Sequence, residues 1–191
     1  MSAPEPGAAA GAARIGPCAL DVIELAACAG RAGALRQLAA TRGLTLPALG
    51  GLTRHGGGLV LAVRPERWLL LLGRGAPGAS HAAWAEASAG LAAAVDLSDA
   101  LAAFHVAGVE PAAWRAAGCR LDLERQAEPG AAATSVAQSA VILVRIPGRW
   151  LLLGPSTLAA HLAHWLAHDL AHGTALQAPC PLADWLGDET R

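Results

Sequence analysis

The sequence predicts an α+β fold in which two similar halves, each of strand, helix, hairpin and helix, pack together. The first observation is a match without gaps between residues 59–71 (LVLAVRPERWLLL) and residues 141–153 (VILVRIPGRWLLL). The second is that strand patterns and helical patterns flank both matching segments in the same order. Hairpins in place of obligatory crossover connections favour the α+β class over a parallel α/β sheet.

The first half contains one complete unit. A strand pattern over residues 20–25 precedes a helical pattern over residues 32–42, and Gly43 follows as a left-handed helix cap. The hairpin of residues 59–71 comes next, with a two-residue turn that begins with proline. A helix over residues 80–90, which starts at a serine suited to an N-cap, completes this half.

The second half repeats this order. A strand over residues 101–106 is followed by a helix over residues 111–118, because its first residue is a proline and proline suits a first helical turn. In the second hairpin, the Pro-Gly pair at 147–148 suits the central positions of a type II turn. A last helix is expected over residues 156–172, with a serine as its cap and a glycine after its end.

Two tryptophans, Trp68 and Trp150, occupy equivalent positions in the matching hairpins. The apolar fraction of 54% consists largely of alanine, so a large indole ring has few competitors as a core anchor. We therefore expect both rings to be buried against the helices of their own halves.

Two segments rich in glycine or alanine are predicted to be connections. Residues 50–58 contain five glycines but neither a Gly-Lys-Ser/Thr ending nor a Gly-x-Gly-x-x-Gly pattern between a strand and a helix, so phosphate binding is not supported. A mobile loop that leads into the first hairpin is expected instead. Residues 124–139 are expected to form a long connection ahead of the second hairpin.

These elements predict a single domain of two related halves. Residues 1–14 are expected to be a disordered tail, and residues 15–178 the domain, with halves at 15–94 and 95–178. Residues 179–191 are expected to be a C-terminal docking or lid segment.

The C-terminal segment carries an apolar cluster of Leu182, Trp185 and Leu186 after Pro179 and Pro181. The segment is too short and too rich in proline to form a core of its own. These side chains must therefore dock on a partner or fold back onto the domain, and docking is slightly favoured.

Charge and hydropathy exclude several functions. Fourteen arginines and 15 acidic residues give a net charge of -1. The arginines are scattered along the sequence and form no basic cluster, which argues against a nucleic-acid partner. The strongly apolar runs are far shorter than the roughly 20 residues that cross a bilayer. Residues 1–13 lack a signal-peptide pattern, so the cytoplasm is the expected location. In that compartment the cysteines, which have no Cys-x-x-Cys spacing, are expected to be inert thiols: Cys18, Cys28, Cys119 and Cys180.

The residue types of a hydrolytic triad lie close together at Asp96, Ser98, Asp99 and His105. Ser98 lacks the Gly-x-Ser-x-Gly elbow that exposes a nucleophilic serine over an oxyanion hole. We expect Ser98 and Asp99 to separate two elements, with His105 on one face of the strand that follows. Hydrolysis is therefore not predicted.

The last predicted helix carries four histidines on one face: His161, His164, His168 and His172. The pairs His164/His168 and His168/His172 have the i, i+4 spacing that can present two imidazoles to one metal ion. An apolar stripe borders them, and no carboxylate at metalloprotease spacing accompanies them. A half-buried helix flank or a subunit contact is the preferred interpretation, and we assign no catalytic, cofactor-binding or metal-binding residue to this chain.

The second half contains an ordered set of short motifs: residues 95–99 (VDLSD), 104–108 (FHVAG), 118–123 (GCRLDL), 140–153 and 156–170. This ordered set resembles the gamma subunit of heterotetrameric sarcosine oxidase, and the similarity covers about residues 15–175. Its most specific piece is the string Cys-x-Leu-Asp-Leu before a long connection and a hairpin. More distantly, the layout is similar to the folate-binding half of the glycine-cleavage T-protein, an aminomethyltransferase.

This resemblance implies a non-catalytic subunit with an aminomethyltransferase-like fold and no cofactor of its own. In the family, the beta subunit carries the flavins FAD and FMN, the alpha subunit carries NAD and the tetrahydrofolate site, and the delta subunit carries zinc. The complex demethylates sarcosine oxidatively to glycine and forms hydrogen peroxide and 5,10-methylenetetrahydrofolate. The alpha, beta and delta subunits are thus the expected partners.

Two other functions stay open on the sequence. A free-standing folate-binding or aminomethyltransferase-like protein would need acidic pocket residues, for which Asp96, Asp99 and Asp122 are the central candidates. A structural or metal-storing protein that uses the histidine helix is the other possibility.

Overall fold

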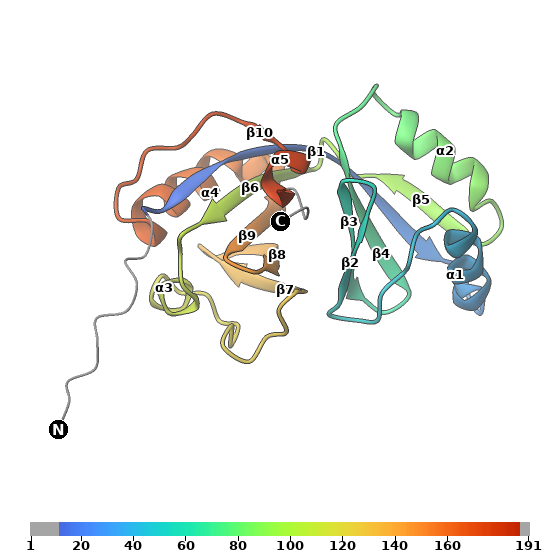
Figure 1. The fold of residues 1–191 in the computed structure, drawn as a ribbon, viewed down its shortest axis with the longest axis horizontal. Helices are drawn as coiled ribbons and strands as arrows, with labels where there is room; N and C mark the ends of the chain where they lie inside the picture. The colour runs from blue at the N-terminus through green and yellow to red at the C-terminus, as the bar shows by residue number, and fades with distance from the viewer. Residues whose placement is uncertain (1–11, 188–191) are drawn as a thin grey trace.

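The computed structural model describes residues 12–187 and shows two lobes (Figure 1). The first lobe contains α1 (Ala32–Thr41), β2 (Leu52–His55), β3 (Gly58–Arg64), β4 (Arg67–Gly73), α2 (Ala79–Ala87) and β5 (Ala92–Asp96). The second contains β6 (Leu101–Ala107), α3 (Pro111–Ala116), β7 (Gly130–Val136), β8 (Ser139–Ile146), β9 (Arg149–Pro155), a 3-10 turn (Ser156–Leu158), α4 (Ala159–Trp165), a π-helical turn (Leu166–Leu170), β10 (Cys180–Pro181) and α5 (Leu182–Leu186).

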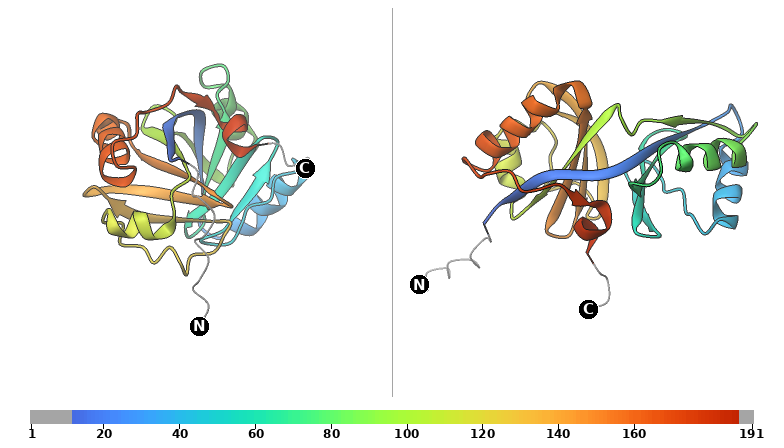
Figure 2. Two further views of the ribbon diagram at one scale, coloured as in Figure 1. Left: turned by 60° about the vertical axis from the view of Figure 1, so that its left-hand side comes forward. Right: turned by 90° about the horizontal axis from the view of Figure 1, so that it is seen from above.

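One long strand, β1 (Arg14–Ala27), runs through both lobes (Figure 2). Its residues 14–17 pair with β6, and its residues 20–26 pair with β4. The strand is much longer than the expected residues 20–25. It includes Arg14, which was expected to belong to the N-terminal tail. Most of that expected tail, residues 1–11, lies outside the described residues. Backbone pairing, and not packing alone, therefore joins the two halves.

The strands follow the order β2-β3-β4-β1-β6-β9-β8-β7, and β5 and β10 also pair with β1. The pairs are antiparallel except for β1 with β10. The Ala131 N–H donates to the Gly50 carbonyl, which brings the start of β7 beside the segment before β2 and curves the sheet towards a barrel. The expected α+β class is confirmed.

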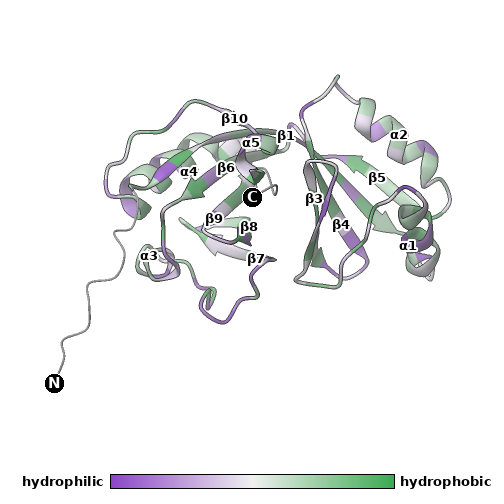
Figure 3. Ribbon diagram, viewed as in Figure 1, coloured by the Kyte–Doolittle hydropathy of each residue, from purple (hydrophilic) through white to green (hydrophobic). Residues whose placement is uncertain are grey.

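Three hydrophobic clusters make up the core. One lies under α1 in the first lobe, one lies under α3 and α4 in the second, and a third fills the space between the sheets of the two lobes. Alternate residues of a strand serve different clusters, because successive side chains point to opposite faces. In β9, Leu152 faces the helices and Leu151 faces the central cluster. Figure 3 shows hydrophobic residues on both strands and helices, and hydrophilic residues on several of the connections.

The sequence repeat has the packing role that was expected. Trp68 and Trp150 are 1% and 3% exposed, and each lies in the cluster beneath the helices of its own lobe. Both indole N–H groups donate to a backbone carbonyl at 2.9 Å, that of Pro47 in the first lobe and that of Val109 in the second. Both expected hairpins are present, as β3–β4 and β8–β9.

The expectation of a mobile loop over residues 50–58 is wrong. Residues 52–55 form β2, which pairs with β3. Gly56 and Gly57 have φ angles of +50° and +77°, as a two-residue hairpin turn with a positive φ at both central positions requires. The glycines therefore form a tight turn between paired strands.

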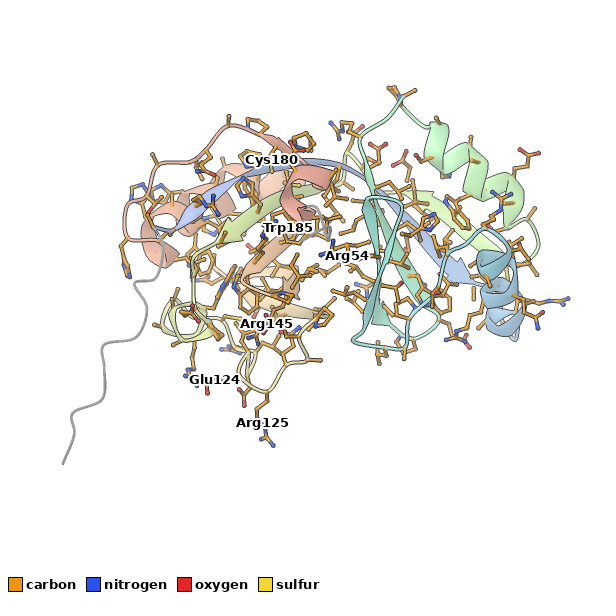
Figure 4. The ribbon with its side chains drawn as sticks, viewed as in Figure 1. Arg54, Glu124, Arg125, Arg145, Cys180 and Trp185 are labelled. Atoms are coloured by element: carbon orange, nitrogen blue, oxygen red, sulfur yellow. The ribbon has the colours of Figure 1, made fainter. Side chains whose placement is uncertain are left out.

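The long connection expected over residues 124–139 is also shorter than predicted, because residues 130–136 form β7 beside β8. What remains of it is held in place by Arg145, whose guanidinium donates to the Leu123 carbonyl at 2.6 Å and pairs with Glu128 at 2.6 Å (Figure 4). The strand β5 was not predicted from the sequence, because a run of alanines has little intrinsic strand preference. Pairing with β1 stabilises it.

The helix boundaries were predicted with mixed success. Gly43 has a φ of +72° after α1, as expected of a left-handed cap, and the next N–H, that of Leu44, donates to the Ala39 carbonyl. Ser80 does not cap α2, which begins one residue earlier after Gly78. The last predicted helix is divided into a 3-10 turn, an α-helix and a π-helical turn. No helix within residues 12–187 is long and apolar enough to cross a membrane.

Candidate functional site

Asp96, Ser98 and His105 do not form a catalytic triad. Ser98 Oγ donates to Asp96 Oδ1 at 2.6 Å and accepts the N–H of Val22 at 3.0 Å. His105 lies on β6 opposite Gly16 of β1, whereas Ser98 contacts β1 at Val22. Gly16 and Val22 are six positions apart, which is about 20 Å along an extended strand. Ser98 therefore connects the β5–β6 turn to β1 and lies far from the imidazole.

The three acidic residues considered for a folate site do not converge. Asp96 accepts hydrogen bonds from the side chain and the backbone of Ser98, which lower its pKa. The Asp99 side chain is fully exposed and approaches Arg74 only to 4.0 Å. Asp122 lies on the α3–β7 connection of the second lobe. These positions do not build one acidic pocket.

The histidine face is divided between separate contacts. His161 Nε2 is 3.0 Å from the Ala137 carbonyl at the β7–β8 turn. His164 and His168 stack on one another with ring centroids 4.3 Å apart, and His172 lies beyond the end of the helical segment. Within residues 12–187, no three His, Cys, Asp or Glu side chains are grouped so that they could hold a metal ion. The contacts are those of a helix flank.

The C-terminal segment folds back onto its own domain. Leu182, Trp185 and Leu186 are buried in the central cluster, and β10 pairs with β1. The preference for docking these three side chains on a partner is therefore wrong, and the lid alternative describes them. Their apolar surface is already removed from water within the chain, which is the arrangement that hydrophobic burial favours. Residues 188–191 lie outside the described residues.

This segment covers a pocket of about 200 Å³, which we call the C-terminal pocket. It is formed where the start of β1, the end of β6 and the start of β9 meet the segment that leads into α5. Trp185 and Cys180 mark its cover in Figure 4. The polar and aromatic residues that line it are Arg14, His105, Arg149, Gln177, Asp184 and Trp185.

Two buried nitrogen atoms at this pocket have no hydrogen-bond partner among the described residues, His105 Nε2 and Trp185 Nε1. The two side chains are only 7% and 4% exposed. The imidazole fits over β1 because its cross-strand neighbour is Gly16, where a Cβ would lie 2.6 Å from His105 Nε2. Burial, and then the nearby Arg14, lower the pKa of His105. The imidazole is therefore a neutral ring packed on β1, and neither of the two unpartnered nitrogen atoms is accessible from the pocket.

The lowered pKa of His105 predicts a loss of stability in mild acid. The unfolded chain takes up a proton on this imidazole below about pH 6.5, whereas the folded chain resists protonation to a lower pH. The stability that the neutral ring contributes is therefore complete above about pH 6.5 and is lost as the pH falls towards the folded pKa. Urea unfolding between pH 5 and 7.5 should show this slope, and His105→Gln should reduce it. An equal reduction by His168→Gln, at an exposed histidine, would contradict the assignment.

Two thiols face each other at the edge of this pocket. Cys18 and Cys180 are register partners in the β1–β10 pair, and their thiols share a hydrogen bond. Burial raises the pKa of Cys18, and the neighbouring Cys180 raises it further. Burial also raises the pKa of Cys180. Both groups are therefore held as neutral thiols, which are poor nucleophiles.

This pairing predicts selective thiol chemistry. With a disulfide reagent at pH 8, the exposed Cys28 should react with the reagent first, the half-buried Cys180 more slowly, and the buried Cys18 and Cys119 only as the chain unfolds. Counting released chromophore with and without denaturant measures this difference. Cys28→Ser should remove the fast phase. A rapid phase of two or more thiols in the folded protein would contradict the assignment of Cys18 and Cys180 as neutral, slowly reacting thiols.

The pocket could not be found from the sequence, because its residues come from positions spread between 14 and 185. The sequence repeat gave no signal of it either. Arg149 is the counterpart of Arg67, and Arg67 pairs with Glu24 at 3.3 Å in the first lobe. Arg149 instead donates to the backbone carbonyl of Trp185. The two copies of the Arg-Trp pair have therefore taken different roles.

Comparison with solved structures finds two informative similarities. A chain of the heterotetrameric sarcosine oxidase from Corynebacterium sp. U-96, solved in complex with pyrrole 2-carboxylate, has a TM-score of 0.71 and 25% identity over 86% of this chain and 87% of that chain. Glycine cleavage system aminomethyltransferase T from Bartonella henselae has a TM-score of 0.62 and 12% identity over 91% of this chain and 49% of that chain. This chain thus spans about half the length of that aminomethyltransferase.

The sequence alone matches no protein-family model and no curated protein. The structural similarities nevertheless confirm the resemblance expected from the ordered motifs. The chain is similar to a subunit of a sarcosine oxidase complex, and its fold is that of the aminomethyltransferase.

Proposed function

We propose that this chain is the non-catalytic gamma subunit of a heterotetrameric sarcosine oxidase. The observation that carries this proposal is the similarity to a sarcosine oxidase chain across 87% of that chain, at 25% identity. This chain and the sarcosine oxidase chain match over nearly their whole lengths, as expected of corresponding subunits. The aminomethyltransferase, in contrast, is about twice as long as the region that matches. The separation of Asp96, Asp99 and Asp122 also speaks for a supporting role.

In this proposal the alpha, beta and delta subunits are the partners, and they carry FAD, FMN, NAD, tetrahydrofolate and zinc. The gamma subunit binds none of these cofactors and supports the oxidative demethylation of sarcosine by stabilising the assembly. The complex forms glycine, hydrogen peroxide and 5,10-methylenetetrahydrofolate on the other subunits. A cytoplasmic location belongs to the same proposal.

Affinity purification of the tagged full-length chain from its native host tests the proposal. We expect flavin-bearing chains to co-purify and the eluate to produce hydrogen peroxide when sarcosine is added. The chain produced alone should show neither flavin absorbance nor sarcosine oxidation. A monomeric chain that recovers no flavoprotein would contradict the subunit proposal.

The same preparation separates the alternative of a free-standing folate-binding protein, which the similarity of the fold to the aminomethyltransferase favours. Titration of the isolated chain with tetrahydrofolate by calorimetry should give no binding heat if the chain is a supporting subunit. Saturable binding to the monomer would favour the alternative.

A further inference from the structure

We propose that Cys18 and Cys180 form a reversible disulfide that fixes the C-terminal lid to β1. The C-terminal lid is β10 together with α5, residues 180–186, and we call the disulfide the latch. The oxidant is hydrogen peroxide, which is also a product of the complex proposed above. The inference goes beyond the role of a supporting subunit, and it rests on the geometry of the two cysteines and not on that role.

The backbone places the two thiols within reach of a disulfide. Cys18 and Cys180 are register partners in the parallel β1–β10 pair. Neighbouring strands lie about 4.7–4.9 Å apart, and the Cα atoms of disulfide-bonded cysteines lie about 4.4–6.8 Å apart. Both side chains belong to the central cluster, Cys18 inside it and Cys180 packed against it, so they lie on the same face of the sheet. They already share a hydrogen bond, and the bond therefore requires no new pairing of the backbone.

The other two cysteines lie away from this pair. Cys28 is exposed just beyond the end of β1, which is about 30 Å along the extended strand from Cys18. Cys119 is buried in the cluster beneath α3 and α4, on the opposite side of the second-lobe strands from the central cluster. Proximity therefore selects Cys18 with Cys180.

Oxidation takes two steps and consumes one molecule of peroxide. The thiolate of the half-buried Cys180 attacks a peroxide oxygen, so that an S–O bond forms, the O–O bond breaks and the released hydroxide takes up the thiol proton to give water. Cys18 then attacks the sulfur of the resulting sulfenic acid, so that the S–S bond forms, the S–O bond breaks and a second water leaves. The buried Cys18 enters only at this second step, where the adjacent sulfur acts at a high effective concentration.

The surroundings of the pair make this reaction slow. Burial raises the pKa of both thiols, and the carboxylate of Asp184 adds to the rise at Cys180. Little thiolate is therefore present at neutral pH, and the thiolate is the reactive form. The latch should close under sustained exposure to peroxide and stay open during a brief pulse.

A closed latch should strengthen the attachment of the C-terminal lid. The lid packs three apolar side chains into the central cluster, but β10 pairs with β1 through two residues only. The bond would close a loop of chain from Cys18 to Cys180, and cross-links across long loops stabilise most in the chain-entropy model. We expect the unfolding temperature to rise by about 5 °C or more.

Peptide mapping of the full chain provides a direct test, in a Cys28→Ser background that removes the exposed thiol. The chain contains no lysine, so trypsin releases Cys18 within residues 15–31 and Cys180 within residues 150–191. The folded protein is incubated with hydrogen peroxide at about pH 8.5, near the ordinary pKa of a thiol, and the remaining thiols are then blocked in denaturant. We expect the two peptides to be linked and dithiothreitol to separate them. Thermal unfolding of the oxidised and the reduced protein measures the effect on the lid.

Two variants in the same background separate the pair from the other buried thiol. Cys180→Ser should lose both the linked peptides and the rise in unfolding temperature, whereas Cys119→Ser, the matched control, should keep both. The linked peptides are identified in a chain that retains both cysteines, so this result does not depend on the folding of Cys180→Ser.

Three results would overturn the proposal. In the first, the folded chain shows no link after prolonged oxidation, or the link forms only in denaturant. In the second, Cys180 is oxidised to a sulfinic acid while Cys18 remains a free thiol. In the third, the linked chain unfolds at the same temperature as the reduced chain. Each concerns the cysteine pair and not the proposed subunit role, because the chain is tested without other subunits.

Discussion

Replacing Trp150 with alanine is expected to lower the free energy of unfolding by about 3–5 kcal/mol. The ring is 3% exposed and lies 5.5 Å from the ring of Trp114, centroid to centroid, in the cluster beneath α3 and α4. The substitution leaves a cavity in a cluster bounded by helices, and it also leaves the Val109 carbonyl without its indole donor. Urea unfolding monitored by circular dichroism measures the loss.

The sequence repeat makes the same prediction for Trp68→Ala, because that ring is 1% exposed and donates to Pro47 in the same way. Trp150→Phe should cost clearly less than Trp150→Ala, since most of the apolar contact is retained. Leu49→Ala, at a side chain that is 63% exposed, is the control and should change stability by about 0.5 kcal/mol or less. Losses below about 1 kcal/mol at both tryptophans would mean that the repeat has no role in packing.

Leu182→Ala should destabilise the protein by about 2–5 kcal/mol. Leu182 is completely buried in the central cluster, where α5 closes over strands from both lobes. Because β10 and α5 are adjacent, loosening this side chain also weakens the pairing of Cys180 with Cys18 in β1. Thermal unfolding of the full chain measures the effect, and the thiol of Cys180 should become more reactive in the same variant.

Leu176→Ala provides a matched control in the same segment, because Leu176 is 43% exposed and lies outside the three core clusters. It should leave the unfolding temperature nearly unchanged. An unfolding temperature of Leu182→Ala equal to that of the unmodified chain would contradict the role of this side chain in the core.

The sequence repeat predicted the burial of its tryptophans but not the contacts of its arginines. Trp68 and Trp150 could be predicted as buried because the same apolar strands and the same turn occur twice, and each strand requires one face against helices. The position of Arg149, in contrast, depends on α5, which has no counterpart in the first lobe. The same motif therefore predicted packing correctly in both halves but carried no information on the partner of its arginine.

The sequence by itself determined the α+β class, the two hairpins, the burial of the repeated tryptophans and the glycine cap after α1, because each depends on periodicity or on backbone preferences within a few residues. Only the tertiary structure decided that β2, β5 and β7 are strands, that Leu182, Trp185 and Leu186 close over their own core, and that Arg14 and His105 meet Trp185 at one pocket. The alanine- and glycine-rich sequences of β5 and β7 have little strand preference of their own, and these strands form because a neighbouring strand pairs with them. A pocket built from residues between 14 and 185 likewise exists only after the long strand β1 has joined both lobes and the last segment has folded over it.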